Sequence, residues 1–182
     1  INPEVVGNVR NIVISDQAGK SNIVSRLKSI GIDFKKDDQN IKKLLEEVKD
    51  REFIGYSYDG ADASFELLAR RIMGEIPRYI SIKQYDVSVK KNSEGKIISS
   101  AKAQLEVDKK LIICEGEGNG PVHALDNAIR KNVDKLAKYS QYLKDLKLVD
   151  YKVRILNTGT EAVTRVSIES TDSNGKNWFT IG

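Results

Sequence analysis

The residues whose types and spacing most clearly suggest a binding or catalytic function lie between Ile113 and Val133. There a short apolar segment is followed by three glycines and then by a helical pattern. Gly116, Gly118 and Gly120 lack a Cβ, so backbone N–H groups there can come close to a bound group. The unpaired N–H groups of a helix start favour an anion such as a carboxylate. The segment has neither the Gly-Lys-Ser/Thr ending of a phosphate loop nor the spacing of the dinucleotide fingerprint. A tight connection without a ligand is the alternative.

Two side chains beside this turn, Cys114 and His123, are of types that could act in catalysis. Cys114 is the single cysteine; its apolar strand pattern favours a small buried residue over a nucleophile and excludes a disulfide framework. His123 is the single histidine. Because no second histidine or cysteine could complete a site with it, we expect His123 to be a residue of the helix start rather than a metal ligand or general base. A stand-alone enzyme is therefore the least favoured class.

Composition limits the remaining classes of protein. A chain of 182 residues, 40% hydrophobic and 31% charged, can form one globular domain or two small ones. The net charge of +4 comes from lysines that alternate with acidic residues, which is typical of a solvated surface and gives little support to a nucleic-acid partner. We find no apolar run of membrane length, so we expect no membrane partner and a cytoplasmic setting. Because the chain begins at Ile1 rather than Met, we expect a fragment of a longer protein.

The sequence pattern of residues 1–76 predicts a helical linker subdomain. Ser21 and Gly31 bound a first helix, and Asp37 or Asp38 caps a second. Three short helices make a weak core, so we expect this part to pack on a neighbouring domain or subunit. The apolar stripes of the three helices are Ile23, Val24, Leu27 and Ile30; Ile41, Leu44, Leu45 and Val48; and Phe65, Leu68 and Ile72.

Residues 77–182 predict a second domain, because the apolar period changes from 3.6 to 2 after Pro77. Three strands, with a bulge near Gln84, precede a helix that carries Val122, Leu125, Ile129, Val133 and Leu136. Three further strands repeat the pattern. The fold class is therefore α+β, a helical linker followed by two βββα units whose second terminal helix is absent. The predicted strands are Ile80–Val89, Ala101–Val107, Leu111–Cys114, Tyr151–Ile155, Val163–Ser170 and Asn177–Ile181, with hairpin turns at Asn92–Gly95 and Asn174–Gly175.

Several stretches resemble a known family. The segments EGEGNGPVHALDNAIRK, LVDYKVRIL and NTGTEAVTRVSIES are similar to the C-terminal regulatory domain of the 2-isopropylmalate synthase family. Upstream, INPEVVGN, SDQAGKSNI and GADASFELLARR resemble the linker of its citramalate synthase branch. The resemblance implies a homodimer that binds a branched-chain amino acid as feedback inhibitor. It also implies that the catalytic (β/α)8 barrel and its divalent metal lie outside this chain, so we expect no catalytic residue, metal ligand or cofactor here.

The resemblance also implies an effector site. An amino acid needs an apolar pocket for its side chain and N–H donors for its carboxylate, and the turn from Asn119 to Val122, including Gly120, can supply the donors. Carried over by position, the residues expected in the pocket are Val122, His123, Leu148, Tyr151 and Ile155.

The function that follows is regulatory. We expect the C-terminal part of an acyltransferase of the citramalate branch, which condenses acetyl-CoA with pyruvate on the route to isoleucine, with isoleucine as the inhibitor. A leucine-binding part of a 2-isopropylmalate synthase is the alternative, because one methyl position changes affinity by only about 1–3 kcal/mol. A remote alternative is an RNA-binding α+β module that stacks bases on Tyr85, Trp178 and Phe179.

Overall fold

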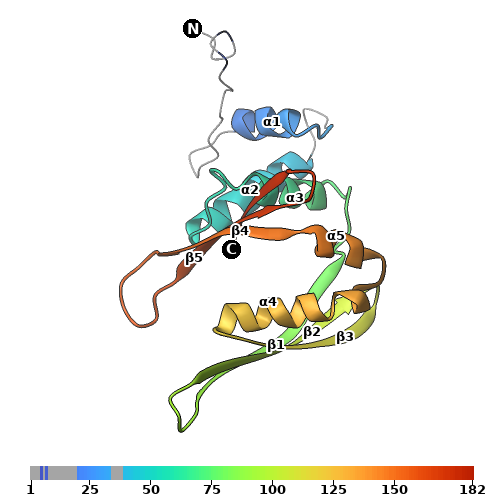
Figure 1. The fold of residues 1–182 in the computed structure, drawn as a ribbon. Helices are drawn as coiled ribbons and strands as arrows, with labels where there is room; N and C mark the ends of the chain where they lie inside the picture. The colour runs from blue at the N-terminus through green and yellow to red at the C-terminus, as the bar shows by residue number, and fades with distance from the viewer. Residues whose placement is uncertain (1–4, 6, 8–19, 34–38) are drawn as a thin grey trace. The chain divides into compact units, whose positions relative to one another are not determined.

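The computed structural model describes residues 5, 7, 20–33 and 39–182 (Figure 1). The predicted cap at Asp37 or Asp38 and most of the linker stretches INPEVVGN and SDQAGKSNI lie outside these residues. Helices come first, and two three-stranded antiparallel sheets follow with a helix between them, which confirms the α+β class. The chain separates into two compact units, Ile1–Pro77 with Leu148–Gly182 and Arg78–Lys147, which are described separately. The predicted division of function at residues 76 and 77 stays a prediction.

The first unit begins with the three predicted helices, α1 (Lys20–Ser29), α2 (Gln39–Phe53) and α3 (Asp62–Ile72). Each helix turns its apolar stripe toward the other two, because residues three or four apart share a helix face. Gly31 has a φ of +70°, the left-handed conformation predicted for the residue that ends α1. The buried core of this part is formed by Ile23, Leu27, Ile32, Ile41, Leu44, Val48, Tyr58, Phe65, Leu68 and Ala69.

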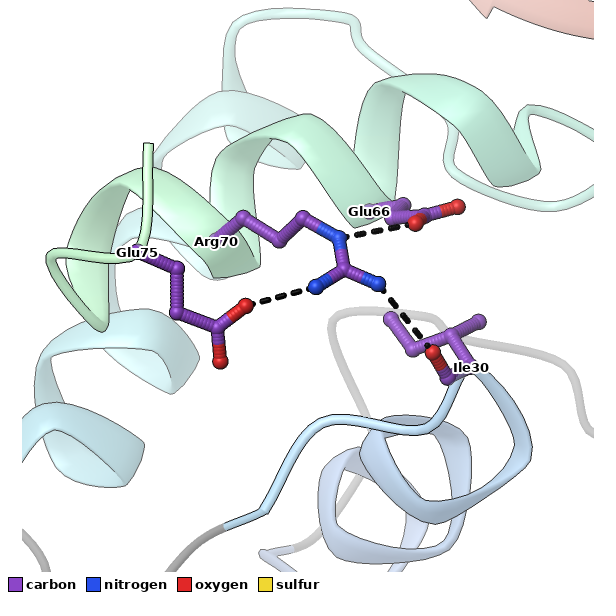
Figure 2. Close-up of polar contacts among 4 residues, drawn as sticks. All are labelled: Ile30, Glu66, Arg70 and Glu75. Carbon is purple, nitrogen blue, oxygen red and sulfur yellow. Dashed lines mark hydrogen bonds and ion pairs between the residues drawn. The ribbon is translucent and has the colours of Figure 1, made fainter. Parts of the chain in front are cut away.

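Arg70 ties the end of α3 to α1 (Figure 2). Its Nε donates to Glu66 at 2.8 Å and its Nη1 to Glu75 at 2.6 Å, while its Nη2 donates to the carbonyl oxygen of Ile30 at 3.4 Å. Ile30 follows the last residue of α1, where carbonyl groups lack intrahelical partners. One guanidinium therefore satisfies a helix end and holds two acidic side chains, a pattern that the fork geometry of arginine allows.

The same unit contains the second sheet, with strand order β4 (Lys147–Ile155), β5 (Thr164–Thr171) and β6 (Asn177–Ile181). The predicted hairpin between β5 and β6 is confirmed: Gly175 has a φ of +76°, and the Asp172 carboxylate accepts the N–H groups of Asn174 and Lys176 at 3.0 and 2.9 Å. The Ser64 hydroxyl on α3 accepts the N–H of Ile181 at 3.0 Å. The helices of this unit thus bond directly to the edge strand of its sheet.

The second unit is built on the sheet β1 (Ile80–Lys91), β2 (Ile97–Val107) and β3 (Lys110–Gly118). The register of β1 against β2 shifts between Ile82 and Gln84, which confirms the predicted bulge. The Asn92 side chain accepts the N–H groups of Glu94 and Lys96, so the predicted β1–β2 turn is also confirmed.

One helix, α4 (Pro121–Lys131), covers the sheet of the second unit (Figure 1). The prediction of one helix reaching Leu136 is wrong. The Asn132 side chain donates to the carbonyl oxygens of Ala128 at 2.8 Å and Glu115 at 3.3 Å, and such bonds to the backbone compete with helix continuation. The chain continues as the 3-10 helix η2 (Val133–Tyr139) and α5 (Ser140–Asp145). The buried core comprises Ala101, Ala103, Leu105, Val107, Cys114, Ala124, Ala128, Val133 and Leu136.

Candidate functional site

The junction of β3 and α4 differs from the glycine turn that the sequence predicts. Strand β3 continues through Gly116 and Gly118, and neither residue has a positive φ. A Cβ on Gly116 would lie 2.3 Å from the backbone nitrogen of Ala128, and one on Gly118 would lie 2.6 Å from that of Ala124. These two glycines therefore let the helix backbone rest on the strand, which gives them a packing role that the sequence analysis did not assign.

The start of α4 is the part of this junction with open donors. Gly120 is the N-cap, with an extended backbone and no side chain, and Pro121 is the first helical residue, which has no N–H. The first intrahelical bond runs from the N–H of Ala124 to the carbonyl of Gly120 at 2.9 Å. The N–H groups of Val122 and His123 precede that bond, so they are the first-turn donors that an anion could use.

His123 shapes the turn rather than a metal site. Its Nδ1 accepts the N–H of Asn119 at 3.2 Å. A neutral imidazole that accepts at Nδ1 carries its proton on Nε2, and this ring is exposed, so Nε2–H is available as a donor. Because the Asn119 N–H is already bonded to His123 and Pro121 has none, the predicted donor set from Asn119 to Val122 is reduced to Gly120 and Val122.

The other predicted residues lie on β4, which belongs to the first unit from Leu148 onward. Side chains alternate between the two faces of a strand, so Tyr151 and Ile155 share a face and Leu148 lies on the other. All three are exposed in the described structure. Tyr151 and Ile155 therefore lie on one surface of β4. The residues of the β3–α4 turn form a second group, in the other unit.

Two hollows on the described part of the chain were not predicted from the sequence. One, of about 470 Å³, lies on the second unit and is lined by charged and polar side chains, including the ion pair of Lys102 and Glu115 at 2.7 Å. The hydrogen bond from Lys102 lowers the pKa of the Glu115 carboxyl, so this pair stays ionised. The other hollow, of about 100 Å³, lies between residues 59–61 and the second sheet. The first is too polar and the second too small for an aliphatic amino acid.

Catalytic groups are not supported at this junction. Cys114 is fully buried, and burial raises the pKa of its thiol, so the side chain is a core residue, as predicted. Among residues 5, 7, 20–33 and 39–182, no group of three His, Cys, Asp or Glu side chains could hold a metal ion. In the same residues, no helix is long and apolar enough to cross a membrane.

Comparison with known proteins gives one family and a consistent set of relatives. Residues 59–182 match the family described as the LeuA allosteric (dimerisation) domain. All of the chain aligns at 43% identity with 34% of an (R)-citramalate synthase from Aquifex aeolicus. It aligns at 40% identity with 34% of one from Geobacter sulfurreducens and at 39% with 33% of one from Sulfolobus acidocaldarius. The chain thus spans about a third of the length of the curated relatives it matches.

Proposed function

Because the chain belongs to the LeuA allosteric (dimerisation) domain family, we propose that it forms the regulatory and dimerisation part of an (R)-citramalate synthase. The observation that carries this proposal is the alignment of the whole chain with (R)-citramalate synthases at up to 43% identity. The parent enzyme would condense acetyl-CoA with pyruvate in the cytoplasm, on the route to isoleucine.

The reaction itself is assigned to a catalytic domain outside this chain. Its expected divalent metal would be held in that domain; among the described residues, no group of three His, Cys, Asp or Glu side chains could hold one. The residues at the β3–α4 junction contain no nucleophile paired with a base, since Cys114 is buried and His123 is bonded to the backbone. We therefore derive no catalytic step in this chain.

We propose that isoleucine is the effector, and that the residues of the β3–α4 turn and those of β4 each take part in binding it. The N–H groups of Gly120 and Val122 and the Nε2–H of His123 would bind the carboxylate. The side chains of Val122, Tyr151 and Ile155 would contact the aliphatic side chain; each is exposed, which supports a role in contacting something other than the core. Asn119 holds His123 in place, and Leu148 stays an expected lining residue at the start of β4.

Isothermal titration of the 182-residue chain with isoleucine, leucine and valine tests this proposal. Selective micromolar binding of isoleucine is the expected result. Selective binding of leucine would favour the alternative, the regulatory part of a 2-isopropylmalate synthase. Absence of binding by all three amino acids would overturn the effector site, although it would leave the family unaffected.

The RNA-binding alternative receives no support from the arrangement of the aromatic side chains. Trp178 and Phe179 are consecutive in β6, so they point to opposite faces of the sheet. The Lys176 ammonium lies 5.3 Å from the centre of the Trp178 ring. Tyr85 belongs to the other unit. A base-stacking platform needs several aromatic rings on one face.

We also propose the division of labour predicted from the sequence. Residues 77–182 would act as the allosteric domain and residues 1–76 as the linker that passes its signal to the catalytic domain. The three-helix core supports the second role, because Arg70 and the ion pair of Arg26 with Asp62 fasten α1 to α3.

A further inference from the structure

The connection between β3 and α4 contains a chemically labile pair of residues, an asparagine followed by a glycine. The backbone nitrogen of the glycine can attack the side-chain carbonyl carbon of the asparagine, because glycine has no Cβ to obstruct the approach. Ring closure expels ammonia and gives a succinimide, which water then opens to aspartate or isoaspartate. The chain contains this pair twice, as Asn119-Gly120 and as Asn174-Gly175, so the two sites can be compared within one molecule.

The first pair, Asn119-Gly120, presents the reacting groups in an accessible position. Neither residue belongs to a helix or strand, because β3 ends at Gly118 and α4 begins at Pro121. Asn119 is exposed, and its side-chain amide has no hydrogen-bond partner in the part of the chain that the structure describes. The N–H of Gly120 likewise makes no hydrogen bond to any described residue. The attacking nitrogen is therefore not held away from the side chain that it must reach.

The second pair, Asn174-Gly175, is held in a hairpin turn. The N–H of Gly175 donates to the Asp172 carbonyl oxygen at 3.1 Å, and the N–H of Asn174 donates to the Asp172 carboxylate at 3.0 Å. Gly175 must lose its bond before its nitrogen can attack, and a bond that has to break first adds to the barrier. We therefore expect Asn174 to react more slowly than Asn119, although the two dipeptides are identical.

We propose that Asn119 is a site of spontaneous deamidation, and that its conversion weakens binding of a carboxylate at the start of α4. The first part depends only on the comparison of the two pairs. The second part rests on the proposed function, which assigns the N–H groups of Gly120 and Val122 to the isoleucine carboxylate. Each conversion replaces a neutral amide with a carboxylate beside these donors, and like charges repel. Isoaspartate also adds one carbon to the main chain between Asn119, whose N–H is bonded to His123, and Gly120.

The proposed effector would in turn protect Asn119. A carboxylate bonded to the N–H of Gly120 would occupy the attacking nitrogen, as the Asp172 carbonyl occupies that of Gly175. A chain with isoleucine bound would then keep its asparagine, whereas an empty chain would convert it and lose sensitivity to isoleucine with time.

Peptide mapping by mass spectrometry of the 182-residue chain, incubated at mildly alkaline pH without isoleucine, tests the first part. It measures conversion of each asparagine to aspartate and isoaspartate. We expect Asn119 to convert at least about fivefold faster than Asn174; equal rates, or faster conversion of Asn174, would overturn the proposal.

Gly120→Ala is the matched variant for this measurement. Gly120 has an extended backbone and no atom within 4 Å of its would-be Cβ, so the variant should fold as the wild type does. The added methyl group obstructs the attack, so conversion should be suppressed at Asn119 and unchanged at Asn174. Conversion of Asn119 at the wild-type rate in this variant would contradict the mechanism.

Isoleucine titration by calorimetry tests the second part. We expect Asn119→Asp to bind isoleucine at least about fivefold more weakly than the wild type, and saturating isoleucine to slow conversion of Asn119 but not of Asn174. Unchanged affinity of Asn119→Asp would overturn this part. Conversion of Asn119 in a chain that binds no isoleucine would remove the effector site and keep the deamidation site. Isoleucine binding by a chain whose Asn119 stays intact would do the reverse.

Discussion

Replacement of Gly118 by alanine should test most directly whether the backbone of α4 packs against β3. The added Cβ would lie 2.6 Å from the backbone nitrogen of Ala124 and 2.7 Å from the carbonyl carbon of His123. Both atoms belong to the helix backbone, so no flexible side chain can move aside. Because carbon contacts are optimal near 3.5–4.0 Å, α4 must shift by about 1 Å or the strand must bend.

Two opposing effects set the expected size. Alanine in a strand interior is favoured over glycine by about 0.5–1 kcal/mol, since glycine loses more backbone entropy on folding. Overpacking of a close contact costs about 1–3 kcal/mol, and a contact with backbone belongs near the upper end. The cost of overpacking is therefore larger than the gain in backbone entropy, and Gly118→Ala should lower the free energy of unfolding by about 1–2 kcal/mol.

Urea unfolding followed by circular dichroism measures this effect, with Gly120→Ser as the control. Gly120 has no atom within 4 Å of its would-be Cβ, and serine suits its N-cap position, so the control should be neutral or slightly stabilising. A Gly118→Ala chain with an unchanged midpoint and slope would refute the reasoning. It would mean that the helix does not rest on the strand at this glycine.

Further predictions concern separate parts of the chain. Arg70→Ala should destabilise the three-helix core by about 1 kcal/mol in urea unfolding, a modest value because its side chain is 29% exposed, whereas Arg71→Ala should change little. Lys109→Gly should stabilise the chain by about 1 kcal/mol in the same assay, because Lys109 holds a φ of +64°. Cys114 should react with a thiol reagent only as fast as the chain opens, since its side chain is fully buried and burial also raises the pKa of the thiol; fast labelling of the native chain would contradict this. Tyr151→Ala should weaken isoleucine binding about tenfold or more by calorimetry, and the exposed Tyr142→Ala should not.

Local sequence patterns were sufficient for most of the elements, because each rests on interactions between near neighbours. The period of Ile23 and Leu27 predicts α1, and the Asn174-Gly175 pair predicts the β5–β6 turn. Even the bulge beside Gln84 follows from the change of phase in β1. These features depend on backbone geometry within a few residues of chain.

The face that α4 buries could not be predicted in the same way. Its large apolar residues Leu125 and Ile129 suggest the buried stripe, yet the fully buried positions are Ala124 and Ala128. The reason is non-local: Gly116 and Gly118 bring the two backbones so close that only alanine fits between them. The helix pattern says which residues share a face, but only the strand opposite decides which face lies at the centre.

The same contact explains why sequence alone could not assign Gly116 and Gly118 to packing or to binding. A glycine that admits a ligand and a glycine that admits a helix are identical in sequence, because both provide room beside the backbone. The resemblance to a known family, and not the spacing of glycines, led to the effector residues. Strand alternation places Leu148 on the face of β4 opposite Tyr151, and its expected role in the site stays a prediction.

The seat of α4 also restricts how a ligand at the helix start could influence the rest of the second unit. With Gly116 and Gly118 against the backbone of Ala128 and Ala124, no layer of side chains lies between helix and strand to absorb a movement. Close-packed interiors transmit displacement rather than deform, so α4 and β3 must move together. The flank that carries Val122 then moves with the helix, so a ligand bound at the start of α4 would shift α4 and β3 as one rigid body rather than the helix alone.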